Sequence, residues 1–437
     1  MDHQLELLLH IRNPWLRNQT AFEQEMKEVL PETYVPRLLP ETLDWPIKNK
    51  AHLLVGARQV GKSTFLWHLF SQKKTPPLYV NVEEKLFQGW CESAAFFKQD
   101  IAGLIPPQAP IFIEEAQNLN EAGLFLKGLI DLKVRNPIYV TGSSSFHLLA
   151  QTRESLAGRA VRAILFPFCL RELKDLHVNA LPKVQSYEAK QIALRHMIFG
   201  GYPEVWFGQN PQRDLLNLVQ AFVMRDASDL FKVSNIDAFR RLLTLLANQV
   251  GGLVEITELA NALGIHRQTV SSYLDILIES HIIFFVRPFL GSAKAEVVRT
   301  PKIFFCDNGL RNLLMGSFAE MDNRPDIGAL VENWVASELH RQFPSLLSLH
   351  PPQFWRTKGG AEVDFVIDLP TGPVGIEVKS SHLKSGELSR SAHNFIDLYK
   401  PARFYVVNKT LEESRMVGKT QVHWIPFHLI DTIFADQ

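Results

Sequence analysis

Eight consecutive residues from Gly56 to Ser63 follow the spacing G-x-x-x-x-G-K-S, which is typical of loops that bind phosphate groups. An apolar run at 53–55 precedes this loop, and a helix-like segment follows it. Glycines at these positions let backbone N–H groups point into one concavity, Lys62 can reach the β- and γ-phosphates, and the Ser63 hydroxyl can bind Mg²⁺. The start of the helix adds the positive end of its dipole. We therefore expect ATP and Mg²⁺ as cofactors.

An ordinary Gly-rich surface loop is the alternative, and the strand-like and helix-like segments that flank the loop argue against it. The residues expected to contact the nucleotide are Gly56, Ala57, Arg58, Gln59, Val60, Gly61, Lys62, Ser63 and Thr64.

Two adjacent carboxylates, Glu114 and Glu115, follow the apolar run at 111–113. Ligands bind at the carboxyl ends of strands in parallel sheets, so these side chains are expected beside the phosphate loop. Glu114 would then hold the Mg²⁺ shell, and Glu115 would orient or deprotonate the attacking water. Without the phosphate loop, two solvated residues at a helix start would be the better interpretation.

A third polar strand end comes at Ser143, after the run at 138–140. A side chain there can sense the γ-phosphate or hold the attacking water. Ser143 can equally cap a helix over 145–150, and the two roles are compatible.

The next strand-like run covers residues 163–166, and several arginines lie just before it. An arginine at this place can neutralise transition-state charge in the site of a neighbouring subunit. Arg159 is the first candidate by position, and Arg153 and Arg162 are near enough to compete.

Across residues 50–170 these motifs resemble an AAA+ ATPase core, with phosphate loop, acidic strand end, polar sensor and arginine finger in that order. The resemblance departs at Glu114, where the family usually has Asp, and the longer side chain puts the metal geometry and turnover in question. A second sensor arginine is not assignable, and Arg225 is offered only as a guess.

The bulk properties describe a multidomain globular chain. Its 437 residues suggest about three domains. Lys+Arg and Asp+Glu both number 46, so any nucleic-acid binding must come from local patches. Three widely spaced cysteines argue against a zinc site or a disulfide framework and favour a reducing cytosol. The N-terminus does not resemble a signal peptide, and no apolar run approaches the ~18 residues of a membrane span. We therefore expect a soluble cytoplasmic protein with no membrane partner.

Residues 256–274 have the spacing of a helix-turn-helix. Thr257 is expected to cap the first helix, and Gly264 to form the turn. The strand-like run at 282–287 would be the wing of a winged helix. The shared core would consist of Leu259, Ile265, Val270 and Leu274.

In this arrangement a set of polar residues at the start of the second helix would face a DNA groove. Cations do not outnumber acids between 255 and 299, unlike in a dedicated duplex reader. A winged helix used for packing or oligomerisation is therefore the alternative. The residues expected at DNA are His266, Arg267, Gln268, Thr269 and Ser271.

A second set of charged residues lies near the C-terminus. Asp364 belongs to a strand-like segment over 355–367, and Glu377 and Lys379 belong to another at 375–380 beyond a Pro/Gly turn. Period-two alternation puts Glu377 and Lys379 on one face, with their neighbours entering the core. Glu332 lies beside the apolar stripe of an upstream helix. Together these groups can hold Mg²⁺ and a water for phosphodiester attack.

This arrangement resembles the PD-(D/E)xK, or restriction-endonuclease-like, fold. The resemblance implies metal binding by Glu332, Asp364 and Glu377, and catalysis by Asp364, Glu377 and Lys379. The alternative is an exposed hairpin with a salt bridge between Glu377 and Lys379, because an E-x-K triplet alone is common.

The chain over about 30–430 resembles a prokaryotic AAA+ family whose ATPase core precedes a winged helix and a nuclease-like domain of unassigned function. Gly200 to Glu204 and Cys306 to Leu310 also carry this resemblance. The expected fold is α/β, with a P-loop AAA+ parallel-sheet core. We expect a helical lead-in at 1–45, the core at 46–170, a helical lid at 171–245, a winged helix at 246–298 and a nuclease-like domain at 299–437.

The resulting expectation is a Mg²⁺-dependent ATPase that forms a homo-oligomer, for example a hexameric ring, and acts on DNA. The alternative is an ATP-gated switch or scaffold whose C-terminal domain binds DNA or protein without cutting. A protein-remodelling ATPase would need an aromatic pore loop, which the sequence does not identify.

Overall fold

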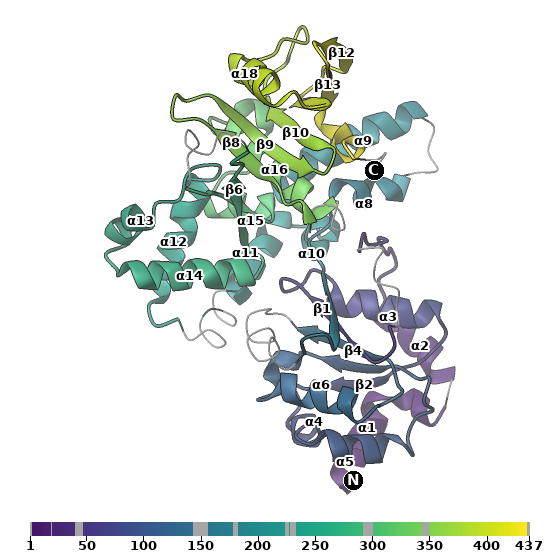
Figure 1. The fold of residues 1–437 in the computed structure, drawn as a ribbon. Coiled ribbons are helices and arrows are strands. Elements are labelled where there is room, and N and C mark those ends of the chain that lie inside the picture. The colour runs from purple at the N-terminus through teal and green to yellow at the C-terminus, as the bar shows by residue number, and fades with distance from the viewer. Residues whose placement is uncertain are drawn as a thin grey trace. The chain divides into compact units, whose positions relative to one another are not determined.

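The protein is described by a computed structural model (Figure 1). The structure describes residues 2–18, 20–39, 47–142, 156–177, 182–222, 227, 233–291, 300–342 and 349–434. The chain forms two compact units, residues 1–166 and 167–437, which are taken in turn below.

The first unit is built on a parallel five-stranded sheet with the order β2-β3-β4-β1-β5. This confirms the expected α/β core with a parallel sheet. Its strands are β1 (Ala51–Val55), β2 (Leu78–Asn81), β3 (Ile111–Glu114), β4 (Ile138–Gly142) and β5 (Ala160–Ile164). Its α-helices are α1 (His3–Arg12), α2 (Thr20–Val29), α3 (Lys62–Gln72), α4 (Lys85–Trp90), α5 (Ala94–Ile101) and α6 (Ala122–Asp131).

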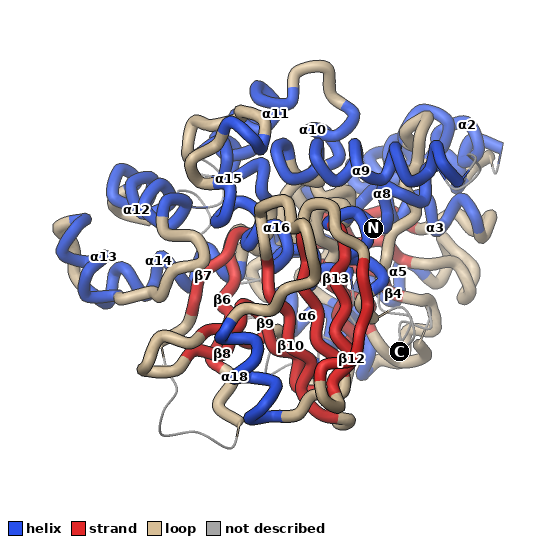
Figure 2. The backbone as a smooth tube through the Cα atoms, turned by 90° about the horizontal axis from the view of Figure 1, so that it is seen from above, coloured by secondary structure: helices blue, strands red, loops and turns tan. Residues whose placement is uncertain are grey.

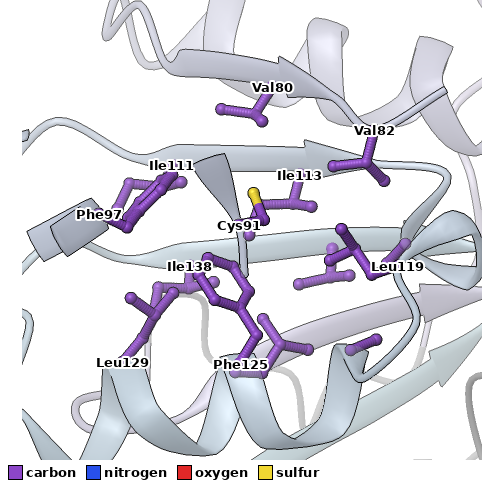
Figure 3. Packing of buried hydrophobic residues seen from close by; sticks show 14 of the residues in the cluster. Val80, Val82, Cys91, Phe97, Ile111, Ile113, Leu119, Phe125, Leu129 and Ile138 are labelled. Carbon is purple, nitrogen blue, oxygen red and sulfur yellow. The ribbon is translucent and has the colours of Figure 1, made fainter. Parts of the chain in front are cut away.

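The apolar runs form strands here because both faces of the sheet are covered. On one face Ile111 and Ile113 of β3 pack with Phe97, Phe125 and other buried residues from the helices (Figure 3). On the other face Phe112 meets the rings of Trp67 and Phe70 on α3. Neighbouring side chains of β3 thus enter two different apolar layers, and the middle strands β1 and β4 are buried along their whole lengths.

The segment before the first strand is part of this unit. Asn13, directly after α1, pairs with the edge strand β2: its Nδ2 donates to the Tyr79 carbonyl at 3.0 Å, and its Oδ1 accepts from the Tyr79 N–H at 2.6 Å. Trp15 Nε1 donates to the Pro77 carbonyl at 2.7 Å. An open sheet edge invites pairing with another chain, and here one amide side chain takes the place of a neighbouring strand.

The second unit contains an eight-stranded mixed sheet with the order β12-β13-β11-β10-β9-β8-β6-β7 (Figure 2). Its strands are β6 (Ile283–Pro288), β7 (Lys302–Phe305), β8 (Gln353–Arg356), β9 (Glu362–Leu369), β10 (Gly372–Val378), β11 (Arg403–Asn408), β12 (Glu413–Val417) and β13 (Thr420–Pro426). Its α-helices include α8 (Leu170–Lys174), α9 (Pro182–Phe199), α10 (Pro203–Phe207), α11 (Pro211–Ala221), α12 (Ile236–Asn248), α13 (Ile256–Leu263), α14 (Arg267–Glu279), α15 (Asn308–Leu314), α16 (Ile327–Gln342) and α18 (Arg390–Tyr399).

The hairpin of β6 and β7 joins the helix-turn-helix segment to the C-terminal strands. β6 pairs with β7 in antiparallel fashion after α14, and its end at Arg287 and Pro288 runs parallel to β8. The boundary expected between 298 and 299 therefore runs between two paired strands. The finer division of this unit into lid, winged helix and nuclease-like parts remains a prediction.

The motif from Gly200 to Glu204 and the motif from Cys306 to Leu310 meet around Asp307, which is fully buried. Its carboxylate accepts hydrogen bonds from the N–H groups of Gly201 at 2.7 Å, Gly309 at 2.8 Å and Leu310 at 3.2 Å. A Cβ at Gly200 would lie 2.0 Å from the same carboxylate. A glycine is therefore required at position 200, and Asp307 fixes the turn between α9 and α10.

A buried ion pair continues this network on α16. Arg341 Nη2 donates to Glu338 Oε1 at 2.6 Å, and Glu338 Oε2 accepts from the Leu170 N–H at 2.9 Å. On α9, His196 accepts a hydrogen bond at Nδ1 from Trp334 Nε1 at 3.0 Å, and its Nε2 donates to the Phe168 carbonyl at 2.9 Å. Those contacts assign the neutral tautomer that carries its proton on Nε2.

In the segments that the structure describes, no helix combines the length and the apolar character that crossing a bilayer requires.

The state of His196 predicts a pH dependence. Burial, with the nearby charge of Arg341, lowers the pKa of His196 well below its ordinary 6.5, and Glu338 is the facing acid, 3.5 Å away. Below about pH 6.5 the unfolded chain takes up a proton that the folded chain refuses, so His196 costs up to about 1.4 kcal/mol of unfolding free energy per pH unit. We expect His196→Gln to lose less thermal stability than the wild type between pH 7 and pH 5. Equal losses in melting experiments would contradict this.

Candidate active site

The phosphate loop lies between β1 and α3, and the nine residues expected at the nucleotide lie together in it and in the first turn of the helix. Gly56 and Gly61 have φ values of +151° and +93°, which favour glycine. A Cβ at Gly56 would lie 2.1 Å from the Leu165 carbonyl oxygen. The first glycine is therefore required by packing against the end of β5, and the second turns the chain into α3.

Lys62 folds back onto the loop. Its Nζ donates to the carbonyls of Ala57 at 2.8 Å and Gly56 at 3.1 Å, and only 6% of the residue is exposed. An ammonium held in this way is aligned by the loop itself, and phosphate oxygens at the loop would compete for its protons.

Glu114 at the end of β3 faces the loop. Ser63 Oγ donates to Glu114 Oε1, and the Tyr79 hydroxyl donates to Oε2, so both carboxylate oxygens are engaged. Burial raises the pKa of Glu114, the two hydrogen bonds oppose this, and the charge of Glu115 adds to it. The structure thus brings Ser63 and Glu114, the two expected Mg²⁺ ligands of this site, together. Oxygen donors of this kind suit Mg²⁺, which keeps several waters and needs few protein ligands.

Sequence reasoning missed Tyr79. It lies on β2, and only the pairing of β2 with β3 in register, Asn81 beside Glu114, brings its phenol to the site.

Glu115 occupies the next position in a strained conformation, with φ +58°. Its carboxylate accepts a hydrogen bond from Gln117 Nε2, and its N–H lies 3.4 Å from the Thr141 hydroxyl at the end of β4. Non-glycine residues in this region cost about 1–3 kcal/mol and often occur at functional sites. Gln117 and Thr141 were also missed, and Ser143 lies outside the described residues.

Arg37, from the segment before β1, contacts the same loop. Its Nη1 donates to the Val60 carbonyl at 2.9 Å, and its Nη2 donates to the Phe166 carbonyl. One guanidinium therefore fastens the phosphate loop to the chain just after β5. Nothing in the local sequence around Arg37 indicates this contact.

The candidate arginine fingers lie elsewhere. Arg159 precedes β5 and forms an exposed ion pair, Nε to Oδ1 of Asp131, at 2.8 Å. In the parallel register Ala160 lies beside Ala51, at the start of β1, whereas the loop follows the end of β1. Arg159 thus lies at the amino ends of the strands, whereas its own phosphate loop lies at their carboxyl ends. Arg162 is exposed on β5, and Arg153 and Arg225 lie outside the described residues.

The C-terminal carboxylates lie on β9, β10 and α16. Asp364 Oδ2 accepts from the Val378 N–H at 2.7 Å across the β9–β10 hairpin. Burial raises the pKa of Asp364 to about 7; the charge of Glu332 contributes, and Lys302 and the Val378 N–H oppose it.

Glu377 and Lys379 form an ion pair at 2.6 Å, and Ser389 Oγ donates to the other oxygen of Glu377 at 3.1 Å. We expected Val378 in the core, but Glu377 is the buried residue and Val378 is half-buried. The reason is that α16 and α18 both pack against β10, and Ser389 at the start of α18 donates a hydrogen bond to Glu377.

A lysine that the sequence did not single out lies among these acids. Lys302 Nζ is 2.9 Å from Glu332 Oε1 and 2.5 Å from Glu362 Oε1. Among the described side chains, no three His, Cys, Asp or Glu residues are grouped to hold a metal ion. Because an ammonium lies 2.9 Å from Glu332, one of the expected ligands, the residues present do not fit the expected Mg²⁺ site of the nuclease-like domain.

In the helix-turn-helix segment, α13 and α14 are joined at Gly264, which has φ +68°. The expected cap is wrong: α13 begins at Ile256 after Glu255, so Thr257 lies inside the first turn. His266, Arg267 and Gln268 at the start of α14 are exposed, and Thr269 and Ser271 are half-buried. The expected core residues Leu259, Val270 and Leu274 are buried, and Ile265 is half-buried.

Comparison with known proteins supports the first unit most directly. Residues 48–174 match the family model described as an AAA domain. Residues 191–320 and 327–430 match two domains of unknown function, DUF8612 and DUF4143. The chain therefore contains a P-loop AAA-type domain, followed by regions to which no function is assigned.

The similar proteins are of microbial origin. An uncharacterized protein of Mycobacterium tuberculosis is 29% identical over 363 residues, covering 81% of this chain and 75% of its own. One of Methanocaldococcus jannaschii is 27% identical over 335 residues, covering 74% and 73%. Among solved structures, the Walker-type ATPase of Pyrococcus abyssi covers 68% of this chain and 94% of its own, with 15% identity and a TM-score of 0.39.

The contact of Gly56 predicts a structural cost that is independent of nucleotide. In Gly56→Ala, the Cβ would collide with the Leu165 carbonyl and φ would stay positive, so we expect the first unit to lose about 2 kcal/mol or more. Gly103→Ala is the matched control, because a Cβ there meets nothing within 4 Å. Denaturant unfolding without ATP measures both, and equal stabilities would contradict the role assigned to Gly56.

Proposed function

We propose that the protein is a Mg²⁺-dependent ATPase whose turnover acts on DNA through the second unit. The observation that carries the ATPase proposal is the grouping around Glu114, which accepts hydrogen bonds from Ser63 on the phosphate loop and from Tyr79 on β2. The match of residues 48–174 to an AAA domain supports the same conclusion.

The roles of the residues follow from this geometry. Backbone N–H groups of the loop and Lys62 bind the phosphates of ATP, and Ser63 and Glu114 would hold Mg²⁺. The ion would supply positive charge that offsets the negative charge of the phosphates. Glu115 orients the attacking water and accepts its proton. Gln117 donates to one oxygen of the Glu115 carboxylate and so orients it, while a carboxylate has further acceptor sites for a water.

Tyr79 offers an explanation for Glu at a position where the resembled family usually has Asp. A glutamate has one more rotatable bond, and its carboxylate is harder to fix. Hydrogen bonds to both carboxylate oxygens remove that freedom, so the longer side chain can still present a defined oxygen to the metal. We therefore propose Tyr79 as a positioning residue of the site.

A homo-oligomer, for example a hexameric ring, is part of the proposal. Arg159 lies at the sheet edge opposite its own phosphate loop, so it can serve as an arginine finger only in a neighbouring subunit. Its ion pair with Asp131 is exposed and of the kind that contributes little to stability, so exchanging it for a phosphate costs little.

For DNA, we propose that residues 246–298 act as a winged helix. The exposed His266, Arg267 and Gln268 at the start of α14 support this, because the first turn of a recognition helix is the part that contacts base edges. We place the protein in the cytoplasm, where its three buried free thiols would remain reduced.

A second candidate function is an ATP-gated switch or scaffold whose nuclease-like domain binds DNA or protein without cleavage. The position of Lys302 between Glu332 and Glu362 favours this candidate, because an ammonium lies among the acids where a nuclease would need a metal ion.

The ATPase proposal is tested by two substitutions with different expected results. Lys62→Ala should lose both ATP binding and turnover. Glu115→Gln should keep ATP binding and lose turnover by about 10²-fold or more, because only the proton acceptor is removed. Lys85→Ala, an exposed lysine at the start of α4, is the control. Phosphate release and nucleotide binding are measured on each protein, and wild-type turnover in Lys62→Ala would refute the ATPase assignment.

The DNA proposal is tested at the start of α14. Replacing Arg267 and Gln268 together by Ala should weaken duplex binding at low salt about ten-fold or more and reduce any stimulation of ATP turnover. Gln212 and Arg213, an exposed pair of the same composition on α11, provide the matched control. Wild-type protein that neither binds DNA nor is stimulated by it would favour the switch with a protein partner.

A further inference from the structure

We propose that Lys302 is a built-in cation that takes the place of the metal ion in the nuclease-like domain, so that this domain does not cleave DNA by a metal-dependent route. The inference rests on the proposed likeness of this domain to PD-(D/E)xK nucleases and is independent of the proposed ATPase. It decides between a nuclease-like domain that cleaves DNA and one that does not. A domain whose acids are already paired with a lysine would serve binding or mechanical coupling.

The contacts of the ammonium carry the proposal. Lys302 Nζ lies 2.9 Å from Glu332 Oε1 and 2.5 Å from Glu362 Oε1. Glu332 belongs to α16 and Glu362 to the start of β9, so one cation joins two elements. Glu332 is also one of the acids that the sequence pattern assigns to the metal.

The surroundings leave the ammonium little freedom. Only 3% of Lys302 is exposed, and its Nζ lies 5.4 Å from the ring centre of Phe354, within cation–π range. The turn before α13 covers Glu332: a Cβ at Gly251 would lie 3.0 Å from the Glu332 carboxylate. The backbone of Lys302 bridges to Leu253 in that same turn, so the strand is fixed as well as the side chain.

Two cations offset much of the negative charge of the three carboxylates in this cluster without a metal ion. Burial alone would lower the pKa of Lys302, but the negative charges of Glu332, Glu362 and Asp364 outweigh it and hold the pKa above its usual value. Arg356 adds a second cation, with its Nε 3.5 Å from Glu362 Oε2. A divalent ion would have to displace an ammonium that is buried and paired twice.

The remaining acids are engaged as well. Asp364 accepts the Val378 N–H, and Glu377 is held by Lys379 and Ser389. The carboxylates that the sequence pattern assigns to one metal ion are thus divided between two ion pairs and a backbone hydrogen bond. Their common role in this structure is to fasten β7, α16, β9 and β10 together.

The experiment compares full-length wild type, Asp364→Asn, Lys302→Met and the double variant, all without nucleotide so that the phosphate loop adds no metal site. Mn²⁺ binding is measured by titration, and thermal stability is measured with and without Mn²⁺. Wild type and Asp364→Asn should give the same titration, and neither should cleave single-stranded, branched or duplex DNA. Lys302→Met should bind Mn²⁺ at least ten-fold more tightly than wild type and gain thermal stability with it, and the double variant should lose that gain.

Either of two results would overturn the proposal: wild type that binds Mn²⁺ or cleaves DNA in a way that Asp364→Asn removes, or folded Lys302→Met that gains no Mn²⁺ site. Circular dichroism establishes which variants fold. Lys302→Arg keeps the charge and should remain free of Mn²⁺. If Lys302→Met does not fold, the comparison of wild type with Asp364→Asn decides alone. ATP turnover is measured separately, so failure of the ATPase proposal leaves this result unchanged.

Discussion

The hydrogen bonds that Glu114 accepts from Ser63 and Tyr79 are the interaction on which the nucleotide site depends. They connect the loop after β1 with the end of β3, which meet because the strands are parallel, and the long Tyr79 side chain reaches the same place from the middle of β2. Every other group of the site is placed relative to this one: Lys62 begins the helix that presents Ser63, and Glu115 follows Glu114 directly. Arg37 and Leu165 then hold the two ends of the loop through contacts with β5 and its continuation.

The second unit depends on buried polar groups that hydrogen-bond to one another and to the backbone. Asp307 satisfies three backbone N–H groups, and Glu338 satisfies a fourth while neutralising Arg341. Such groups are costly to bury and costly to leave unpaired, so they specify one arrangement of their helices more sharply than apolar packing alone. This explains the glycine at position 200, which is part of a recognisable sequence motif: the backbone approaches the Asp307 carboxylate too closely for a side chain there.

How much could be predicted depended on the distance between partners in the sequence. The phosphate loop and the acids at 114 and 115 were predictable because each is a local pattern next to an apolar strand. Tyr79, Arg37 and Lys302 were not, because each acts on a group that only strand order or tertiary packing brings near. Local reasoning also failed within elements. A period-two pattern does not show which faces of a strand are covered by helices, so the burial of Glu377 was missed. A threonine near a helix start, Thr257, was mistaken for the cap of that helix.

Lys302 shows why a set of acids does not by itself define a metal site. The acidic sequence pattern predicts where carboxylates cluster. It does not predict whether a metal ion or a basic side chain balances their charge. A bound metal ion can be exchanged, gained or lost, and it presents open positions to a substrate. An ammonium on a strand is covalently fixed, carries one charge and has no open position. The ion pairs of Lys302 therefore tie β7, the strand paired with β6 after the helix-turn-helix, to α16 and β9. That property suits a domain that transmits a change of position and does not suit one that attacks a phosphodiester.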